Sequence, residues 1–202
     1  MRISLALMLC LTLSAGLARA ADVNANKHRL LATNACERCD LNGVSLAQAG
    51  LLGANLRGAR LAQADLRGAI LTGATLVGAM LKRANLDGAV LGGVDFEHAD
   101  LSAARLRAAT LIRARLSFAN FDGADLRNAR LANANLEGAS FKNADLTGVD
   151  LYDARLHYAD LRQAKLRGAD LSDADLSGAD TTGADTDKTT TCPDFRPGPC
   201  VW

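Results

Sequence analysis

Four cysteines outside the apolar N-terminal stretch are the residues whose types and spacing could most directly do chemistry. Cys36 and Cys39 form a Cys-x-x-Cys motif, and Cys192 and Cys200 lie close together near the C-terminal end. Such pairs can exchange disulfides with a substrate, hold a zinc ion together with a second pair, or form structural disulfides. The elements that surround the two pairs decide among these uses.

The three histidines and the 22 acidic residues could supply acid–base catalysis or metal ligands. His28, His98 and His157 lie far apart and form no spacing that a catalytic or metal motif uses. Most aspartates, such as Asp65 and Asp125, recur at one position of a regular pattern, which is typical of a solvent-exposed repeat position. Aromatic residues make up only 4% of the chain, whereas ligand pockets are commonly lined by them. We expect no catalytic residues, no metal site and no cofactor.

Residues 1–20 have the three-part layout of a secretory signal peptide. Arg2 gives a positive start, an apolar run extends from Ile3 to Leu17, and residues 18–20 read Ala-Arg-Ala, a small-x-small cleavage pattern. The run of about fifteen residues is short for a membrane span, which needs roughly 20, so an uncleaved anchor is the weaker alternative. We expect cleavage after Ala20, a periplasmic or secreted bacterial protein, and no membrane span in the mature chain.

Charge and composition exclude two broad classes. The formal net charge is +1, and removal of the signal peptide leaves 21 basic and 22 acidic residues. Dedicated nucleic-acid binders carry a clear basic excess, so we expect no nucleic-acid partner. Hydrophobic residues make up 49% of the chain, which is too many for a disordered protein. A length of 202 residues suits one domain, or two small ones.

A strict period of five residues dominates the chain after residue 40. Every fifth residue from Leu41 to Leu176 is leucine, except Phe96, Phe121 and Phe141. From Leu46 onward the residue two positions before each is alanine or, in a few places, valine, and glycine is common two positions after. Neither an α-helix of about 3.6 residues per turn nor a strand that alternates between faces places such residues on one side. Extended segments that bend once per five residues do so, and repeated bends stack the leucines inside a coil.

The repeating segments resemble the pentapeptide-repeat family over roughly residues 39–186. Residues 64–68 read Ala-Asp-Leu-Arg-Gly and residues 134–138 read Ala-Asn-Leu-Glu-Gly, as the family's repeats do. The resemblance implies an all-β fold, a right-handed quadrilateral β-helix with four pentapeptides per coil. At a strand spacing of about 4.8 Å, about seven such coils would form a rod roughly 35 Å long.

A solenoid of this kind needs a cap at each end, and both caps are visible in the sequence. We divide the chain into a signal peptide (1–20), an N-terminal cap with a short helix (21–38), a pentapeptide-repeat β-helix (39–186) and a C-terminal capping loop bounded by cysteines (187–202). The capping helix is expected over residues 26–34, with Leu30 and Leu31 covering the first coil. Phe195 or Trp202 is expected to lie on the last coil.

A rod places the two cysteine pairs at opposite ends, which argues against one zinc site within one chain. The redox motif usually opens a helix in a thioredoxin-like βαβ unit, and the sequence contains no such unit. In an oxidising compartment we therefore favour the structural disulfides Cys36–Cys39 and Cys192–Cys200. Redox use of Cys36 and Cys39, and free or intermolecular thiols, are the alternatives.

Residues 20 positions apart stack in columns if four pentapeptides make one coil. One face then carries Gly50, Ile70, Val90 and Thr110 beside Leu52, Thr72, Gly92 and Ile112, and continues into Arg130, Asp150 and Asp170. Contiguous exposed apolar residues often mark contact surfaces. We interpret Leu52, Ile70, Val90 and Ile112 as an interaction patch, and harmless scattered apolar residues are the alternative.

Charge is distributed unevenly along the repeats. Arg105, Arg107, Arg113 and Arg115 occupy one stretch that contains no acid. Between residues 170 and 194 the aspartates are opposed only by Lys188. Under the rule of four pentapeptides per coil, we expect the arginines to point to different faces and to form no single groove.

Two functional classes follow from these features. The first is a non-catalytic scaffold of the bacterial envelope that binds a protein partner or a second copy of itself. The second follows from the resemblance, because some pentapeptide-repeat proteins imitate duplex DNA and bind type II topoisomerases. The signal peptide, the balanced charge and the cysteine-closed tail disfavour this alternative.

Overall fold

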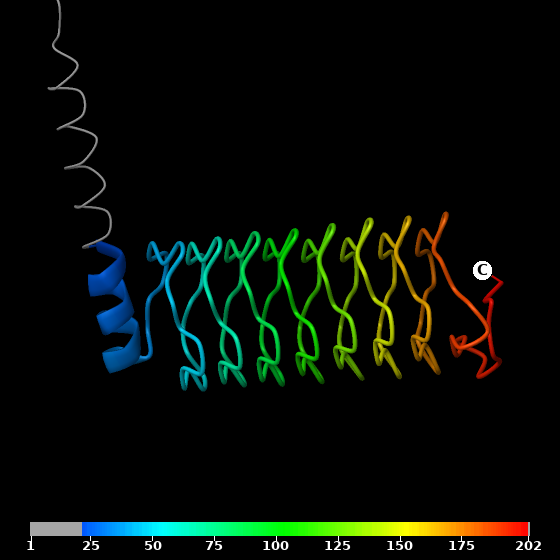
Figure 1. Cartoon of the computed structure of the whole chain (residues 1–202), viewed down its shortest axis with the longest axis horizontal. Helices are drawn as coiled ribbons and strands as arrows, with labels where there is room; N and C mark the ends of the chain where they lie inside the picture. The colour runs from blue at the N-terminus through cyan, green and yellow to red at the C-terminus, as the bar shows by residue number, and fades with distance from the viewer. Residues whose placement is uncertain (1–21, 202) are drawn as a thin grey trace, which may run out of the picture.

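The computed structural model describes residues 22–201, so the expected signal peptide and Trp202 lie outside the described residues. One helix, α1 (residues 22–33), is followed by coils that stack along a single axis and end in a short loop (Figure 1). No helix within the described range has both the length and the apolar character that a membrane crossing requires. The chain therefore forms an elongated solenoid, with α1 at one end and the C-terminal loop at the other.

Parallel β-bridges join each coil to the next with a register of 20 residues. The first coil shows the pattern, in which Asp40 pairs with Arg60, Ser45 with Asp65, Gly50 with Ile70 and Asn55 with Thr75. Each bridge pairs one residue of a coil with one residue of the next. Backbone hydrogen bonds join the coils beside these bridges, as Leu66 N donates to the carbonyl of Asn85 at 2.7 Å. Four bridges per 20 residues give the coil four faces. This register agrees with the expected four pentapeptides per coil and places residues 20 apart in columns.

The leucine and alanine positions form one continuous core. Leu66, Leu116 and Leu161 are fully buried, as are nearly all the leucines and the alanines that precede them by two positions. The phenylalanines occupy the same positions, and the rings of Phe121 and Phe141 stack with centroids 4.9 Å apart. Phenylalanine therefore replaces leucine without interrupting the column, because the rings of neighbouring coils lie parallel to each other.

The corners of the coil require a left-handed backbone two positions after each core residue. Fourteen glycines take a positive φ there, but so do non-glycine residues such as Gln48 (φ 60°) and Phe118 (φ 58°). Gly138 needs to be glycine for two reasons. Its φ is positive (64°), and a Cβ there would lie 2.6 Å from the Phe118 ring of the preceding coil. A bulky corner residue is thus accommodated by glycine one coil later.

The N-terminal cap differs from expectation in extent and in contacts. α1 begins at residue 22 and ends at residue 33, whereas the sequence predicted a helix over residues 26–34. Leu30 is fully buried and Val23 packs partly against the core, but Leu31 is 49% exposed. The prediction that Leu31 covers the first coil is wrong. Only residues about a turn or two apart on one helix face can reach the coil, and Leu31 lies one position off that face.

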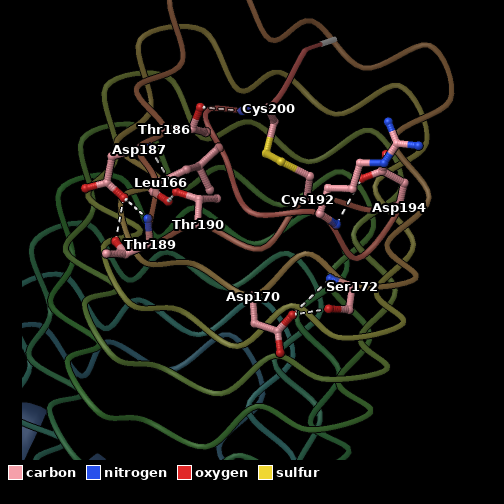
Figure 2. The surroundings of a disulfide bond; sticks show 11 residues. Leu166, Asp170, Ser172, Thr186, Asp187, Thr189, Thr190, Cys192, Asp194 and Cys200 are labelled. Carbon is pink, nitrogen blue, oxygen red and sulfur yellow. Dashed lines mark hydrogen bonds and ion pairs between the residues drawn. A yellow bond between two sulfur atoms is a disulfide. The ribbon is translucent and has the colours of Figure 1, made fainter.

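The C-terminal cap ends the strict register by one inserted residue. Asp170 pairs with Thr191 rather than with a residue 20 positions on, and the buried Thr190 donates its hydroxyl to the carbonyl of Leu166 at 2.9 Å (Figure 2). The loop then turns back, and Thr191 forms an antiparallel bridge with Pro197. Phe195 is 59% exposed, so it does not cover the last coil as predicted.

Candidate functional site

The two cysteine pairs lie at opposite ends of the solenoid. The sulfur atoms of Cys36 and Cys39 are 2.07 Å apart, and those of Cys192 and Cys200 are also 2.07 Å apart (Figure 2). Each pair lies at a junction between the coils and a cap. Cys36, Cys39 and Cys192 are buried, which limits access of a substrate disulfide to their sulfur atoms. This placement favours a structural use of both pairs.

The histidines are not brought together. His98 stacks on Phe118 with ring centroids 5.2 Å apart, whereas His157 Nε2 lies 2.7 Å from Asp175 Oδ2 three coils further on. Within residues 22–201, no group of three or more histidine, cysteine, aspartate or glutamate side chains is placed to hold a metal ion. The described histidines therefore act in local contacts on separate coils.

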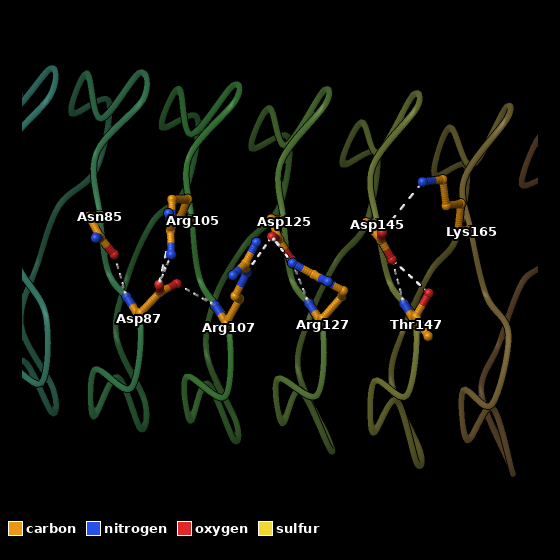
Figure 3. Close-up of polar contacts among 9 residues, drawn as sticks. All are labelled: Asn85, Asp87, Arg105, Arg107, Asp125, Arg127, Asp145, Thr147 and Lys165. Carbon is orange, nitrogen blue, oxygen red and sulfur yellow. Dashed lines mark hydrogen bonds and ion pairs between the residues drawn. The ribbon is translucent and has the colours of Figure 1, made fainter.

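One face of the solenoid carries a ladder of ion pairs, which we call the charged face. It consists of the column Asp65, Asn85, Arg105, Asp125, Asp145, Lys165 and Asp185 and the adjacent corner column Arg67, Asp87, Arg107, Arg127, Thr147 and Arg167. Arg105 Nη2 lies 2.6 Å from Asp87 Oδ2 (Figure 3). Further along the same face, Arg167 Nε lies 2.7 Å from Asp185 Oδ2. These pairs join neighbouring coils.

Asp125 is the most strongly bound carboxylate of the charged face. Arg127 donates to both of its oxygens at 2.9 Å, and Arg107 of the preceding coil donates to Oδ2 (Figure 3). The hydrogen bonds from Arg127, and then those from Arg107, hold the pKa of Asp125 well below its ordinary value, against the effect of burial. The face is thus electrostatically satisfied within the chain.

The arginine-rich stretch is spread over several faces as expected, except that Arg105 and Arg107 share one. Arg113 lies on a second face, and Arg115, on a third, reaches Asp95 and Glu97 at 3.5 Å. The acids were missed because they lie 18 or 20 residues away, although the coil register itself provides the signal. Two aspartates near the C-terminal end are likewise paired from the preceding coil, Asp180 by Arg162 at 3.5 Å and Asp185 by Arg167 at 2.7 Å.

The ion pairs predict a loss of stability in acid. Hydrogen bonds from Arg162, and then from Lys142, lower the pKa of Asp160 from 3.8 to about 2, against the effect of burial. A carboxyl with a lowered folded-state pKa stabilises the fold above its unfolded pKa, and this contribution disappears as the pH falls through the folded value. We expect the free energy of unfolding to fall between about pH 4 and about pH 2. Denaturant unfolding as a function of pH measures this change.

Two substitutions in one column isolate the ion-pair contribution. Asp160→Asn should lower the free energy of unfolding at neutral pH by only about 1 kcal/mol, because these ion pairs are partly screened by solvent. It should also reduce the fall in stability between about pH 4 and about pH 2. Asp100→Asn is the control, since Asp100 accepts a backbone hydrogen bond from Ser102 and has no ion pair in the described part of the chain. Equal pH profiles for the two variants would contradict this account.

The predicted interaction patch lies on the next face, which we call the mixed face. It consists of the column Gly50, Ile70, Val90, Thr110, Arg130, Asp150 and Asp170 and the corner columns Leu52, Thr72, Gly92, Ile112, Ala132, Tyr152 and Ser172, and Gly53, Gly73, Gly93, Arg113, Asn133, Asp153 and Asp173. Leu52 is 64% exposed, Ile70 45% and Val90 41%. Ile112 shares the column of Leu52 but is half-buried. The N-terminal half of the face is therefore apolar and exposed to solvent.

A hollow of about 390 Å³ lies beside the C-terminal loop. Its walls include Leu176, the Cys192–Cys200 disulfide, Arg196 and Val201. Sequence reasoning did not find it, because the fold of a loop bounded by cysteines cannot be read from residue spacing. Its charged lining residues are Asp194 and Arg196, which lie 3.3 Å apart as an ion pair.

Comparison with known proteins identifies the repeat. The family model described as pentapeptide repeats matches in eight copies, over residues 36–73, 49–88, 59–97, 89–128, 129–168 and 154–185. No curated protein matches the sequence.

Solved structures of other pentapeptide-repeat proteins are similar to the chain. HetL of the cyanobacterium Nostoc sp. strain PCC 7120, involved in heterocyst differentiation regulation, is 27% identical, with 85% of this chain and 97% of that chain covered and a TM-score of 0.41. A pentapeptide repeat protein from the thylakoid lumen of Arabidopsis thaliana is 29% identical over 58% and 65% of the two chains, with a TM-score of 0.40. QnrB1, a plasmid-mediated fluoroquinolone resistance protein, is 21% identical over 76% and 93%, with a TM-score of 0.45.

The register of 20 residues, the buried leucine and alanine columns and the left-handed corners are the structural form of the repeats that the family model matches. Because the matched segments cover most of the chain, the chain belongs to the pentapeptide-repeat family.

Proposed function

We propose that the protein is an exported, non-catalytic scaffold of the bacterial envelope that binds a protein partner through the apolar half of the mixed face. The observation that carries the proposal is the exposure of Leu52, Ile70 and Val90 on neighbouring coils of one face. Water-exposed apolar side chains that lie together stabilise a complex when a partner covers them. The charged face, by contrast, satisfies its own charges.

Two features support export. Residues 1–20 have the sequence of a cleavable signal peptide. The four cysteines of the mature chain lie in two pairs at bonding distance, one at each end of the coils. Structural disulfides form and persist in oxidising compartments, so they suit the periplasm or the medium.

Fractionation of the producing cells with intact-mass analysis tests export. We expect a periplasmic or secreted species that begins at Ala21 and contains two disulfides. A full-length, reduced, cytoplasmic species would overturn export. It would also revive the alternative of a DNA-mimicking protein that binds a topoisomerase, as some members of the family do.

Cross-linking in the same cells tests the binding surface. Ile70→Asp combined with Val90→Asp should remove the cross-linked species, because charged groups would then have to be buried against the partner. The fold should persist, since Asp150 and Asp170 occupy the same column. Asn120→Asp combined with Asn135→Asp is the matched control, because it adds the same charge in the columns of two other faces. Equal cross-linking of both variants would show that Ile70 and Val90 do not form the binding surface.

A further inference from the structure

We propose that the mixed face binds an extended segment of its partner that carries apolar side chains at one end and lysine or arginine side chains at the other. The apolar end lies over Leu52, Ile70 and Val90, and the basic end lies over Asp153, Asp170 and Asp173. This inference rests on the proposed function and names the chemistry of the partner.

Three acids of the mixed face, Asp153, Asp170 and Asp173, lack the counterions that other acids of the chain have. On the charged face, Asp87, Asp125 and Asp185 each lie within 2.9 Å of an arginine nitrogen. Among the described residues, neither Asp153 nor Asp173 has a lysine or arginine within ion-pairing distance, and the carboxylate of Asp170 accepts hydrogen bonds only from the neighbouring Ser172 (Figure 2). The C-terminal half of the mixed face therefore presents negative charge that a basic partner can neutralise.

Tyr152 lies among these acids, and their negative charge affects the pKa of its hydroxyl group. It is 43% exposed in the corner column between Ala132 and Ser172. The carboxylate of Asp173, with that of Asp153, raises the pKa of Tyr152 above its ordinary value. The exposed ring also offers a surface on which the stem of a lysine or arginine can lie.

Recognition on this face must come from side chains. Ile70 N donates to the carbonyl of Ala49, and the carbonyl of Val90 accepts from Leu71 N, so the backbone groups of the bridges are used between coils. A partner segment cannot join the sheet as an added strand here, because no row of unpaired backbone groups faces it. A partner segment can therefore be recognised on this face through apolar contact and through charge.

The spacing of the two halves sets the length of the segment. Asp170 lies four coils beyond Val90 in the same column. Four coils at about 4.8 Å span about 19 Å, which an extended chain covers with about six residues. Between the halves lie Arg113 and Arg130, of which Arg130 is 3.9 Å from Asp150. These arginines disfavour basic residues in the middle of the segment and so fix its register.

A designed peptide tests the proposal on the purified, disulfide-bonded protein. The probe carries a short run of leucine and valine, a neutral spacer of about six serine and glycine residues, and a short run of lysine. Fluorescence anisotropy should show binding that weakens with added salt. Replacing the lysines with glutamine, or removing the spacer, should weaken it about fivefold to tenfold, as expected for the loss of a few exposed charge contacts.

Variants of the protein separate this inference from the proposed function. Asp153→Asn combined with Asp173→Asn should weaken the probe about fivefold to tenfold and abolish its preference for lysine over glutamine. Asparagine tolerates the left-handed corner, so the fold is kept. Glu137→Gln, which removes an exposed acid from another face, is the control and should change nothing.

The outcomes distinguish the two claims. If the Ile70 and Val90 variants lose the cellular partner while the Asp153 and Asp173 variants bind the probe normally, the binding face stands and its basic partner is wrong. If the protein alone sediments as a dimer that Ile70→Asp dissociates, the occupant is a second copy and the inference is overturned. If neither pair of variants affects any binding, both claims fail.

Discussion

Leu116→Ala should lower the free energy of unfolding by about 3 kcal/mol, the largest single-residue effect that we expect. Leu116 is fully buried, with Phe96 one coil before it and Leu136 one coil after it in the same core column. Truncation removes buried carbon atoms and leaves a cavity between two coils that cannot collapse, because their backbones are held by bridges on all four faces. Circular dichroism during urea unfolding measures the loss.

Leu176→Ala is the matched control for position along the rod. Leu176 occupies the same place in the repeat but is half-buried near the C-terminal loop. In a solenoid each coil contacts only its neighbours, so a terminal position loses fewer contacts than a central one. We expect less than half of the Leu116 effect. Equal losses at the two positions would show that stability is not carried by neighbouring coils.

The core could be predicted from the sequence because every coil repeats one solution. A leucine every five residues, with alanine two positions earlier, cannot point inward along one α-helix or one flat strand, but it can in a coil that bends once per five residues. Phe121 and Phe141, 20 residues apart, keep that phase, and their rings stack as the column requires. The columns of the mixed face follow from four pentapeptides per coil, which the resemblance to the family implied, so the exposure of Ile70 and Val90 was predictable as well.

The polar contacts could not be predicted to the same extent. The partner of Arg105 is Asp87 and that of Arg167 is Asp185, each 18 residues away on a neighbouring coil. Such a pair depends on which rotamer a long side chain adopts at a corner, and spacing does not determine a rotamer. The caps were also harder to predict, because they occur once and follow no repeat. Leu31 and Phe195 were misplaced for that reason.

Cys192→Ser combined with Cys200→Ser should open the C-terminal end of the solenoid. A disulfide that closes a loop of this size lowers the conformational entropy of the unfolded chain, and this contributes about 2–3 kcal/mol to the free energy of unfolding. The disulfide also holds the segment in which Cys200 N donates to Thr186 Oγ1 at 3.1 Å (Figure 2). In the same segment Gly198 N donates to the carbonyl of Thr190 at 2.7 Å. Without the disulfide, these contacts should fray and expose the last coils.

Native-state hydrogen exchange locates the effect. Backbone amides of Leu171 and Thr191, which bond across the last coils, should lose protection in the double variant, whereas that of Leu116 should keep it. Cys36→Ser combined with Cys39→Ser is the matched control, because it removes the other disulfide and should open only the N-terminal end. An exposed edge of the last coil is also a template for pairing with another chain, so the C-terminal variant should aggregate on mild heating. Uniform loss of protection along the whole rod would instead mean that the solenoid unfolds as one unit, and that the C-terminal cap stabilises every coil rather than its neighbours.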